Sequence, residues 1–225
     1  MNKKNNSFKA FGIALLVFVI YTLAVKFINV KPIGPQNSKV GFGALNGWFF
    51  DSVGSNMIWF DVTEYIGIAS IAIMAGFALF GLYQLIKERS IFGVHPGILA
   101  LGVTYFVLAL FYVLFEKLVI NYRPTLIDGV LEASYPSSHT MLIVTVMITA
   151  MIQLNKMLEN KDVKFGLTLF FFGVAILATF GRLWSGVHWL TDIIGGVILS
   201  VCLIILYATM YKRFSKINKS ASYRR

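Results

Sequence analysis

The chain has 225 residues, of which 57% are hydrophobic and only 13% are charged. A soluble domain of this size carries about 25% charged residues, so the composition excludes an ordinary soluble protein and favours one polytopic membrane domain. The net charge of +10 does not indicate nucleic-acid binding, because the basic residues follow a membrane topology. The single cysteine, Cys202, lies in an apolar run and predicts a packing role.

Six apolar stretches are long enough to cross about 30 Å of hydrocarbon at about 1.5 Å per helical residue. The expected fold class is therefore all-α, with six transmembrane helices. The stretches lie near residues 10–30, 65–86, 97–118, 139–158, 165–183 and 188–211. The first is too long for a cleavable leader, so we interpret it as a signal anchor.

The segment 31–64 separates the first two spans. It contains Pro32, Pro35, several glycines and a group of aromatic residues that includes Trp48 and Trp59. This pattern predicts an outer loop with a short interfacial helix, whose aromatic side chains lie at the level of the lipid headgroups. A membrane-anchoring belt is the simpler interpretation, and substrate gating is the alternative.

The distribution of Lys and Arg predicts the orientation. With both termini in the cytoplasm, 14 of the 20 basic residues lie on the inner side, as the positive-inside rule requires. The inner set is Lys3, Lys4, Lys9, Lys87, Arg89, Lys156, Lys161, Lys164, Lys212, Arg213, Lys216, Lys219, Arg224 and Arg225; the outer set is Lys26, Lys31, Lys39, Lys117, Arg123 and Arg182. We expect one domain, made of two N-terminal spans (1–94), a motif-bearing core (95–200) and a basic cytoplasmic tail (212–225).

Charged residues at the edge of a bilayer core are costly and therefore usually functional. Arg123-Pro124 follows the third span, and an arginine there offers a planar fork that matches phosphate oxygens. A snorkelling anchor is the alternative for Arg123 alone. Pro136-Ser137-Ser138-His139 begins the fourth span, where free backbone N–H groups attract anions. His139 can supply a proton there, although an ordinary capped helix is equally compatible.

The third cluster contains Arg182, His188 and Asp192. His188 and Asp192 are four residues apart, so on a helix they share a face. A carboxylate beside an imidazole fixes one tautomer and leaves the other nitrogen free to attack. A metal site built on the same pair is the competing interpretation.

The order Arg-Pro, Pro-Ser-x-His and Arg-x5-His-x3-Asp resembles the type-2 phosphatidic acid phosphatase superfamily across roughly residues 95–200. The resemblance implies a helical membrane core, with catalysis in the last four spans and no metal or other cofactor. It also implies that His188 is the nucleophile, Asp192 its orienting partner and His139 the general acid. Phosphate binding falls to Arg123 and Arg182, helped by Ser137, Ser138 and Lys117.

The chain departs from the family pattern at three positions. Glu116 occupies the place of the family lysine, and Lys117 follows one residue late, which on a helix rotates it by about 100°. Ser138 replaces a glycine, and Gly181 replaces a serine. We expect the Ser138 hydroxyl to compensate for the one absent at residue 181.

The resemblance and the orientation together predict hydrolysis of a lipid phosphate or diphosphate at the outer face of the cell membrane. For a bacterial chain, undecaprenyl pyrophosphate fits best, while phosphatidylglycerol phosphate and phosphatidic acid stay open. A protein that binds or translocates lipid phosphates without turnover is one alternative. A lipid phosphotransferase is another.

Overall fold

The computed structural model describes residues 3–222, with side chains from 7 to 219. In chain order its α-helices are α1 (Lys3–Phe27), α2 (Gly43–Val53), α3 (Met57–Glu88), α4 (Pro96–Lys117), α5 (Ser138–Met157), α6 (Lys161–Trp184) and α7 (Leu190–Ser222). Within residues 3–222 there is no β-strand, only isolated antiparallel bridges. The side chains of Lys3 and Lys4, and residues Arg224 and Arg225 of the predicted tail, lie outside the described part.

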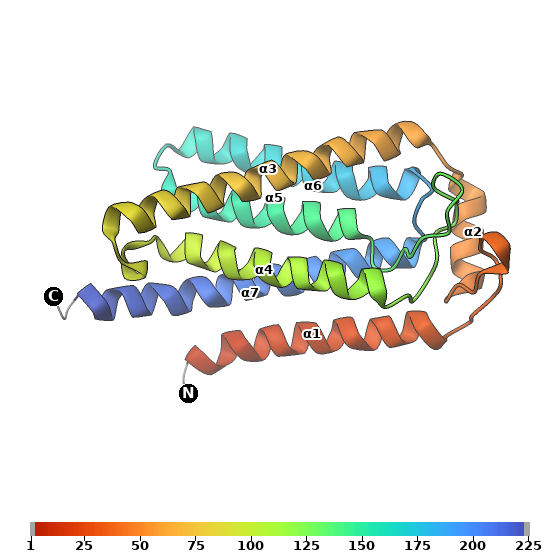
Figure 1. The fold of residues 1–225 in the computed structure, drawn as a ribbon, viewed down its shortest axis with the longest axis horizontal. Coiled ribbons are helices and arrows are strands. Elements are labelled where there is room, and N and C mark those ends of the chain that lie inside the picture. Colours follow the sequence, from red (N-terminus) through yellow and green to blue (C-terminus); the bar gives the residue numbers. More distant parts are fainter. Residues whose placement is uncertain (1–2, 223–225) are drawn as a thin grey trace.

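All of these helices except α2 are long and apolar enough to cross a membrane, which confirms the six predicted spans. They run side by side (Figure 1). In the most apolar windows of α5 and α7, 50% and 56% of the residues are buried, against 11% in α1 and α3. Helices α5 and α7 therefore form the centre of the bundle, whereas α1 and α3 present apolar residues such as Leu16 and Ile68 outward.

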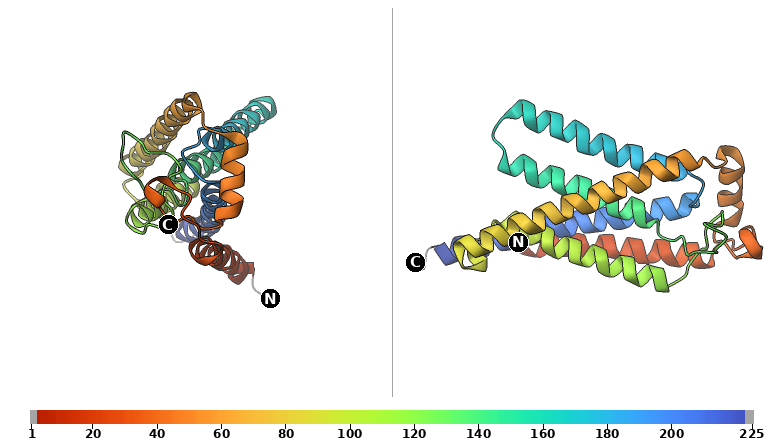
Figure 2. Two further views of the ribbon diagram at one scale, coloured as in Figure 1. Left: turned by 90° about the vertical axis from the view of Figure 1, so that its right-hand side faces the viewer. Right: turned by 45° about the horizontal axis from the view of Figure 1, so that its top comes forward.

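The two ends of the bundle differ. Helix α1 begins and α7 ends at one end, while the motif-bearing loops lie at the opposite end (Figures 1 and 2). Helix α2 lies across that second end. Asn46 of α2 bonds to α7, since its Nδ2 donates to Thr191 Oγ1 at 2.9 Å and its Oδ1 accepts from the Thr191 backbone at 3.2 Å.

Two boundaries differ from the sequence-based expectation. Helix α3 begins at Met57, so residues 57–64 are helical rather than the end of an outer loop. The side chain of Asn56 caps this start by accepting from the backbone of Ile58 at 3.0 Å. Helix α7 continues through 212–222, because neither glycine nor proline follows Gly196 to end it.

Candidate active site

A cavity of about 350 Å³ lies at the end of the bundle that α2 covers. Three of the predicted motifs contribute to its wall, through Arg123, Ser138 and His188. Another part of the wall is the C-terminal end of α4, and consists of Phe111, Tyr112, Phe115 and Glu116. The cavity therefore joins a polar floor to an aromatic face of a membrane helix.

His188 lies in the turn between α6 and α7, because α7 begins only at Leu190. The expectation that His188 and Asp192 share a helix face was therefore wrong about the helix. The two side chains still approach each other, with His188 Nδ1 3.8 Å from Asp192 Oδ2. Asp192 is in the first turn of α7, and its Oδ2 also accepts from the Trp189 backbone N–H at 3.0 Å. That bond folds the turn back so that the carboxylate faces the ring.

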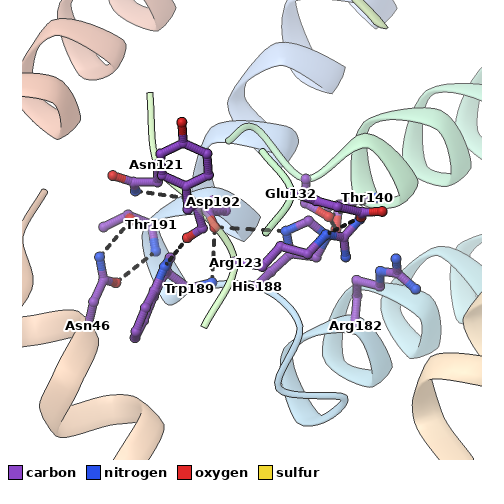
Figure 3. A network of polar contacts seen from close by, with 12 residues as sticks. Asn46, Asn121, Arg123, Glu132, Thr140, Arg182, His188, Trp189, Thr191 and Asp192 are labelled. Carbon is purple, nitrogen blue, oxygen red and sulfur yellow. Dashed lines mark hydrogen bonds and ion pairs between the residues drawn. The ribbon is translucent and has the colours of Figure 1, made fainter. Parts of the chain in front are cut away.

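Asp192 is fully buried, and its carboxylate contacts Asn121, Trp189 and His188 (Figure 3). Asn121 Nδ2 donates to Asp192 Oδ1 at 3.1 Å. The amide of Asn121 is itself oriented by the backbone N–H of Gly41, which donates to its Oδ1 at 3.0 Å. The Asp192 carbonyl accepts from the Ser137 backbone at 3.0 Å, which joins α7 to the start of α5. Asn121 is a site residue that the sequence analysis missed.

The surroundings of His188 lower its pKa well below the usual value. Burial is the largest cause, followed by the positive charges of Arg123 and Arg182 and the proximity of His139, while the Ser134 backbone acts in the opposite direction. The ring is therefore neutral near pH 7. A neutral imidazole whose Nδ1 faces a carboxylate carries its free electron pair on Nε2, which is the form required of a nucleophile.

His139 lies in the first turn of α5 and faces α3. Its Nε2 is 3.1 Å from Glu64 Oε1. The same oxygen accepts from Arg182 Nη1 at 3.0 Å, and Thr63 Oγ1 accepts from that nitrogen at 3.0 Å as well. Glu64 was missed because the sequence analysis placed 57–64 in a loop, where a lone glutamate gives no signal.

Arg123 lies in the loop after α4. Its backbone donates to the Glu132 carbonyl at 3.0 Å, and its Nε pairs with Glu132 Oε2 at 3.0 Å. Each arginine of the site is thus held through one nitrogen by a carboxylate.

Several buried side-chain nitrogens in this region form no hydrogen bond within the described part of the chain. They include Arg123 Nη1, Arg182 Nε and Nη2, His139 Nδ1 and both ring nitrogens of His188. Buried polar groups in folded proteins are nearly always hydrogen-bonded. A set of such nitrogens on two arginines and two histidines suits an anion with several acceptor oxygens, such as a phosphate. Among the described residues, no three His, Cys, Asp or Glu side chains lie close enough to share a metal ion.

The remaining predicted site residues occupy different positions. Ser138 lines the cavity. Ser137 caps α5, and its buried hydroxyl accepts from Thr140 Oγ1 at 3.0 Å, so it does not reach the cavity wall. Lys117 is exposed at the end of α4, whereas Glu116 lines the cavity.

Gly181 lies where α6 packs against α3. A Cβ atom at this position would lie 2.7 Å from Trp59 Cε3 and 3.1 Å from Thr63 Cγ2. The close approach of α3 therefore excludes the serine that the family pattern has here.

Known proteins resemble this chain in sequence and in fold. Residues 98–216, more than half of the chain, match the PAP2 superfamily. The undecaprenyl-diphosphatase BcrC of Bacillus subtilis (strain 168) is 30% identical over 166 residues, which cover 74% of this chain and 80% of that protein. The crystal structure of a transmembrane PAP2-type phosphatidylglycerolphosphate phosphatase from Bacillus subtilis has the same fold, with a TM-score of 0.56 at 18% identity over 92% of this chain and 96% of that one. The chain therefore belongs to the PAP2 superfamily, and its relatives are membrane phosphatases.

Proposed function

We propose that this protein hydrolyses a lipid phosphate or diphosphate through a phosphohistidine on His188. The observation that carries the proposal is the group of buried, unpartnered nitrogens of Arg123 and Arg182 around a neutral His188. Two arginines placed against a phosphate stabilise the charge that develops on its oxygens during transfer.

In the first step, His188 Nε2 attacks phosphorus, and the bond from phosphorus to the lipid oxygen breaks. The electron pair stays on that oxygen, which takes a proton from His139. In the second step, water attacks the phosphohistidine and gives a proton to His139, which releases phosphate and restores neutral His188. Asp192 stabilises the ring of His188 while it is charged.

The proposed substrate is undecaprenyl pyrophosphate, which the 30% identical relative is named for. The fold neighbour is named for phosphatidylglycerolphosphate, so this lipid is the second candidate. Phe111, Tyr112 and Phe115 form the apolar wall of the cavity and offer a surface for the first carbons of a lipid tail.

We place the site on the outer face of the membrane, because 14 of the 20 basic residues then lie inside. Asp128 lies in the loop 118–137 at the end of the bundle that holds the site. A cysteine at Asp128, in a Cys202→Ala background, should react with an impermeant thiol reagent in intact cells. Labelling only after permeabilisation would place the substrate in the inner leaflet.

Phosphate release by the purified protein from a panel of these lipids tests the function directly. We expect release by the wild type in EDTA, since Arg123 and Arg182 supply the positive charge, and a loss of more than about a hundredfold in His188→Ala. Loss on chelation with rescue by a divalent ion would favour the metal interpretation of His188 and Asp192. Binding without release would favour a non-catalytic protein, which Glu116 in the cavity wall and the outward position of Lys117 also suit. Transfer to an acceptor lipid in place of water would indicate a phosphotransferase.

A further inference from the structure

The first two turns of α3 contact two of the predicted site residues, Arg182 and His139. The backbone of Asn56 donates to the Trp184 carbonyl at 3.1 Å, which fixes the start of α3 to the end of α6. Further along, a Cβ atom on Gly67 would lie 3.0 Å from Cδ2 of His139. The glycine thus lets the His139 ring lie against the backbone of α3, within reach of Glu64 on the preceding turn.

Glu64 Oε1 is shared by two groups that the proposed reaction uses. It lies 3.1 Å from His139 Nε2 and 3.0 Å from Arg182 Nη1. Arg182 is only 1% exposed, and its guanidinium also lies over the Phe60 ring at 4.9 Å. The contacts from α3 involve Nη1, whereas Nε and Nη2 form no hydrogen bond within the described part of the chain.

A buried arginine needs a counter-charge, because an unpaired ion in a low-dielectric interior is costly. Among the described residues, Glu64 is the carboxylate that forms an ion pair with Arg182. Two further carboxylates of the site have different partners, since Glu132 pairs with Arg123 and Asp192 faces His188. Glu64 is therefore the carboxylate beside His139, as Asp192 is the carboxylate beside His188.

We propose that Glu64 is a positioning residue for the proton transfer to the leaving lipid oxygen. It orients the His139 ring through Nε2 and, by holding Arg182, sets the phosphate at a fixed distance from that ring. The inference rests on the proposed function, because it assigns Glu64 a part in the step that His139 performs there. A purely structural ion pair with Arg182 is the alternative that the experiment must separate.

The test compares Glu64→Gln with Asp61→Asn as a matched control. Asp61 is an exposed carboxylate one turn earlier on α3 and forms no ion pair with the described residues. Both variants remove one negative charge with little change in volume. Each is assayed by kcat/KM, which reports the steps up to the phosphohistidine, on an alkyl phosphate and on 4-nitrophenyl phosphate. The alkoxide must be protonated as it leaves, whereas 4-nitrophenolate leaves without a proton.

We expect Glu64→Gln to lower kcat/KM for the alkyl phosphate by about tenfold or more, because general acid catalysis supplies at least that part of the rate. The loss of kcat/KM for 4-nitrophenyl phosphate should be much smaller. His139→Ala should show the same selectivity, and Asp61→Asn should match the wild type on both substrates. If the wild type does not hydrolyse the aryl ester, a double variant that combines Glu64→Gln with His139→Ala replaces the comparison of the two esters. On the alkyl phosphate, the second change should then add little to the first.

Three results would overturn the proposal. Equal losses on the two esters would mean that Glu64 acts only on phosphate binding through Arg182. Unchanged activity would mean that the ion pair is structural. A gain in kcat/KM would mean that the carboxylate competes with the phosphate. Failure of the proposed function is a separate result, because it would appear as a wild type that releases no phosphate from any ester.

Discussion

The two histidines of the site are held in different ways. His188 is 3% exposed, and its partner Asp192 is fixed by backbone and amide groups of loops and helix starts. His139 has a side chain that is 22% exposed, and its contact is a carboxylate on a neighbouring helix that also binds Arg182. The position of His188 therefore depends on local chain geometry, whereas the position of His139 depends on how α3 packs against α5 and α6.

The largest expected effect comes from a change at Asp192, beside His188. Asp192→Asn keeps the volume but replaces a carboxylate oxygen with an amide that cannot stabilise a charged His188 ring. We expect kcat to fall by roughly 10²–10⁴, as in other histidine–carboxylate pairs. Single-turnover phosphate release with excess enzyme measures this range. A loss below tenfold would mean that Asp192 only supports the fold.

Asn121 should have a smaller effect, because it acts on Asp192 and not on the substrate. Removing a hydrogen bond to a charged group costs about 1.5–3 kcal/mol, so Asn121→Ala should lower kcat by about tenfold or more. Asn155→Ala is a suitable control, since Asn155 bonds Thr168 near the opposite end of the bundle. Similar losses in both variants would indicate general destabilisation.

The different surroundings of the two histidines also explain which residues of the site could be predicted from the sequence. The six spans follow from apolar length, and the spacing of the motifs at span ends predicted that Arg123, His139 and His188 belong to one end of the bundle. Glu64 could not be found in this way, because its partners are 75 or more residues away in the chain and meet it only through helix packing. Asn121 was hidden for a similar reason, since an asparagine before Arg-Pro has no periodic pattern. The segment 57–64 was misread because its aromatic residues, typical of an interface, begin a helix capped by Asn56.

A side chain at Gly181 tests how far the site around His139 depends on the packing of α3 against α6. From sequence, Gly181→Ser was expected to recover part of the activity lost in Ser138→Gly. The structure changes this expectation, because a side chain at 181 would meet Trp59 and Thr63. Overpacking of this kind costs about 1–3 kcal/mol and would move α3 together with Glu64. We now expect Ser138→Gly to lower activity by about tenfold, the value of one bond to a charged group, and Gly181→Ser to lower both the thermal midpoint and kcat/KM without rescue. Recovery in the double variant would show that α3 yields easily.

The smallest effect expected is a dependence of stability on pH. The pKa of His188 is lowered by burial, and burial also lowers that of His95, which caps α4 near the other end of the bundle. In the unfolded chain both rings titrate near pH 6.5, so below that pH the unfolded chain binds protons that the folded protein does not. The contribution of these rings to stability is therefore complete above about pH 6.5 and falls as the pH drops, by at most about 1.4 kcal/mol per pH unit for a fully buried ring such as His188 and by less for His95.

Thermal midpoints in detergent at pH 7.5 and 5.5 measure this loss, and each kcal/mol corresponds to about 2–4 °C for a chain of this length. His188→Gln should reduce the difference between the two midpoints more than His95→Gln does, because His188 is the more deeply buried of the two. An unchanged difference in His188→Gln would mean that the ring takes up its proton in the folded protein. An ordinary pKa would leave the His188 ring charged below about pH 6.5, where it could not attack phosphorus, so phosphate release would then fall as the ring titrates.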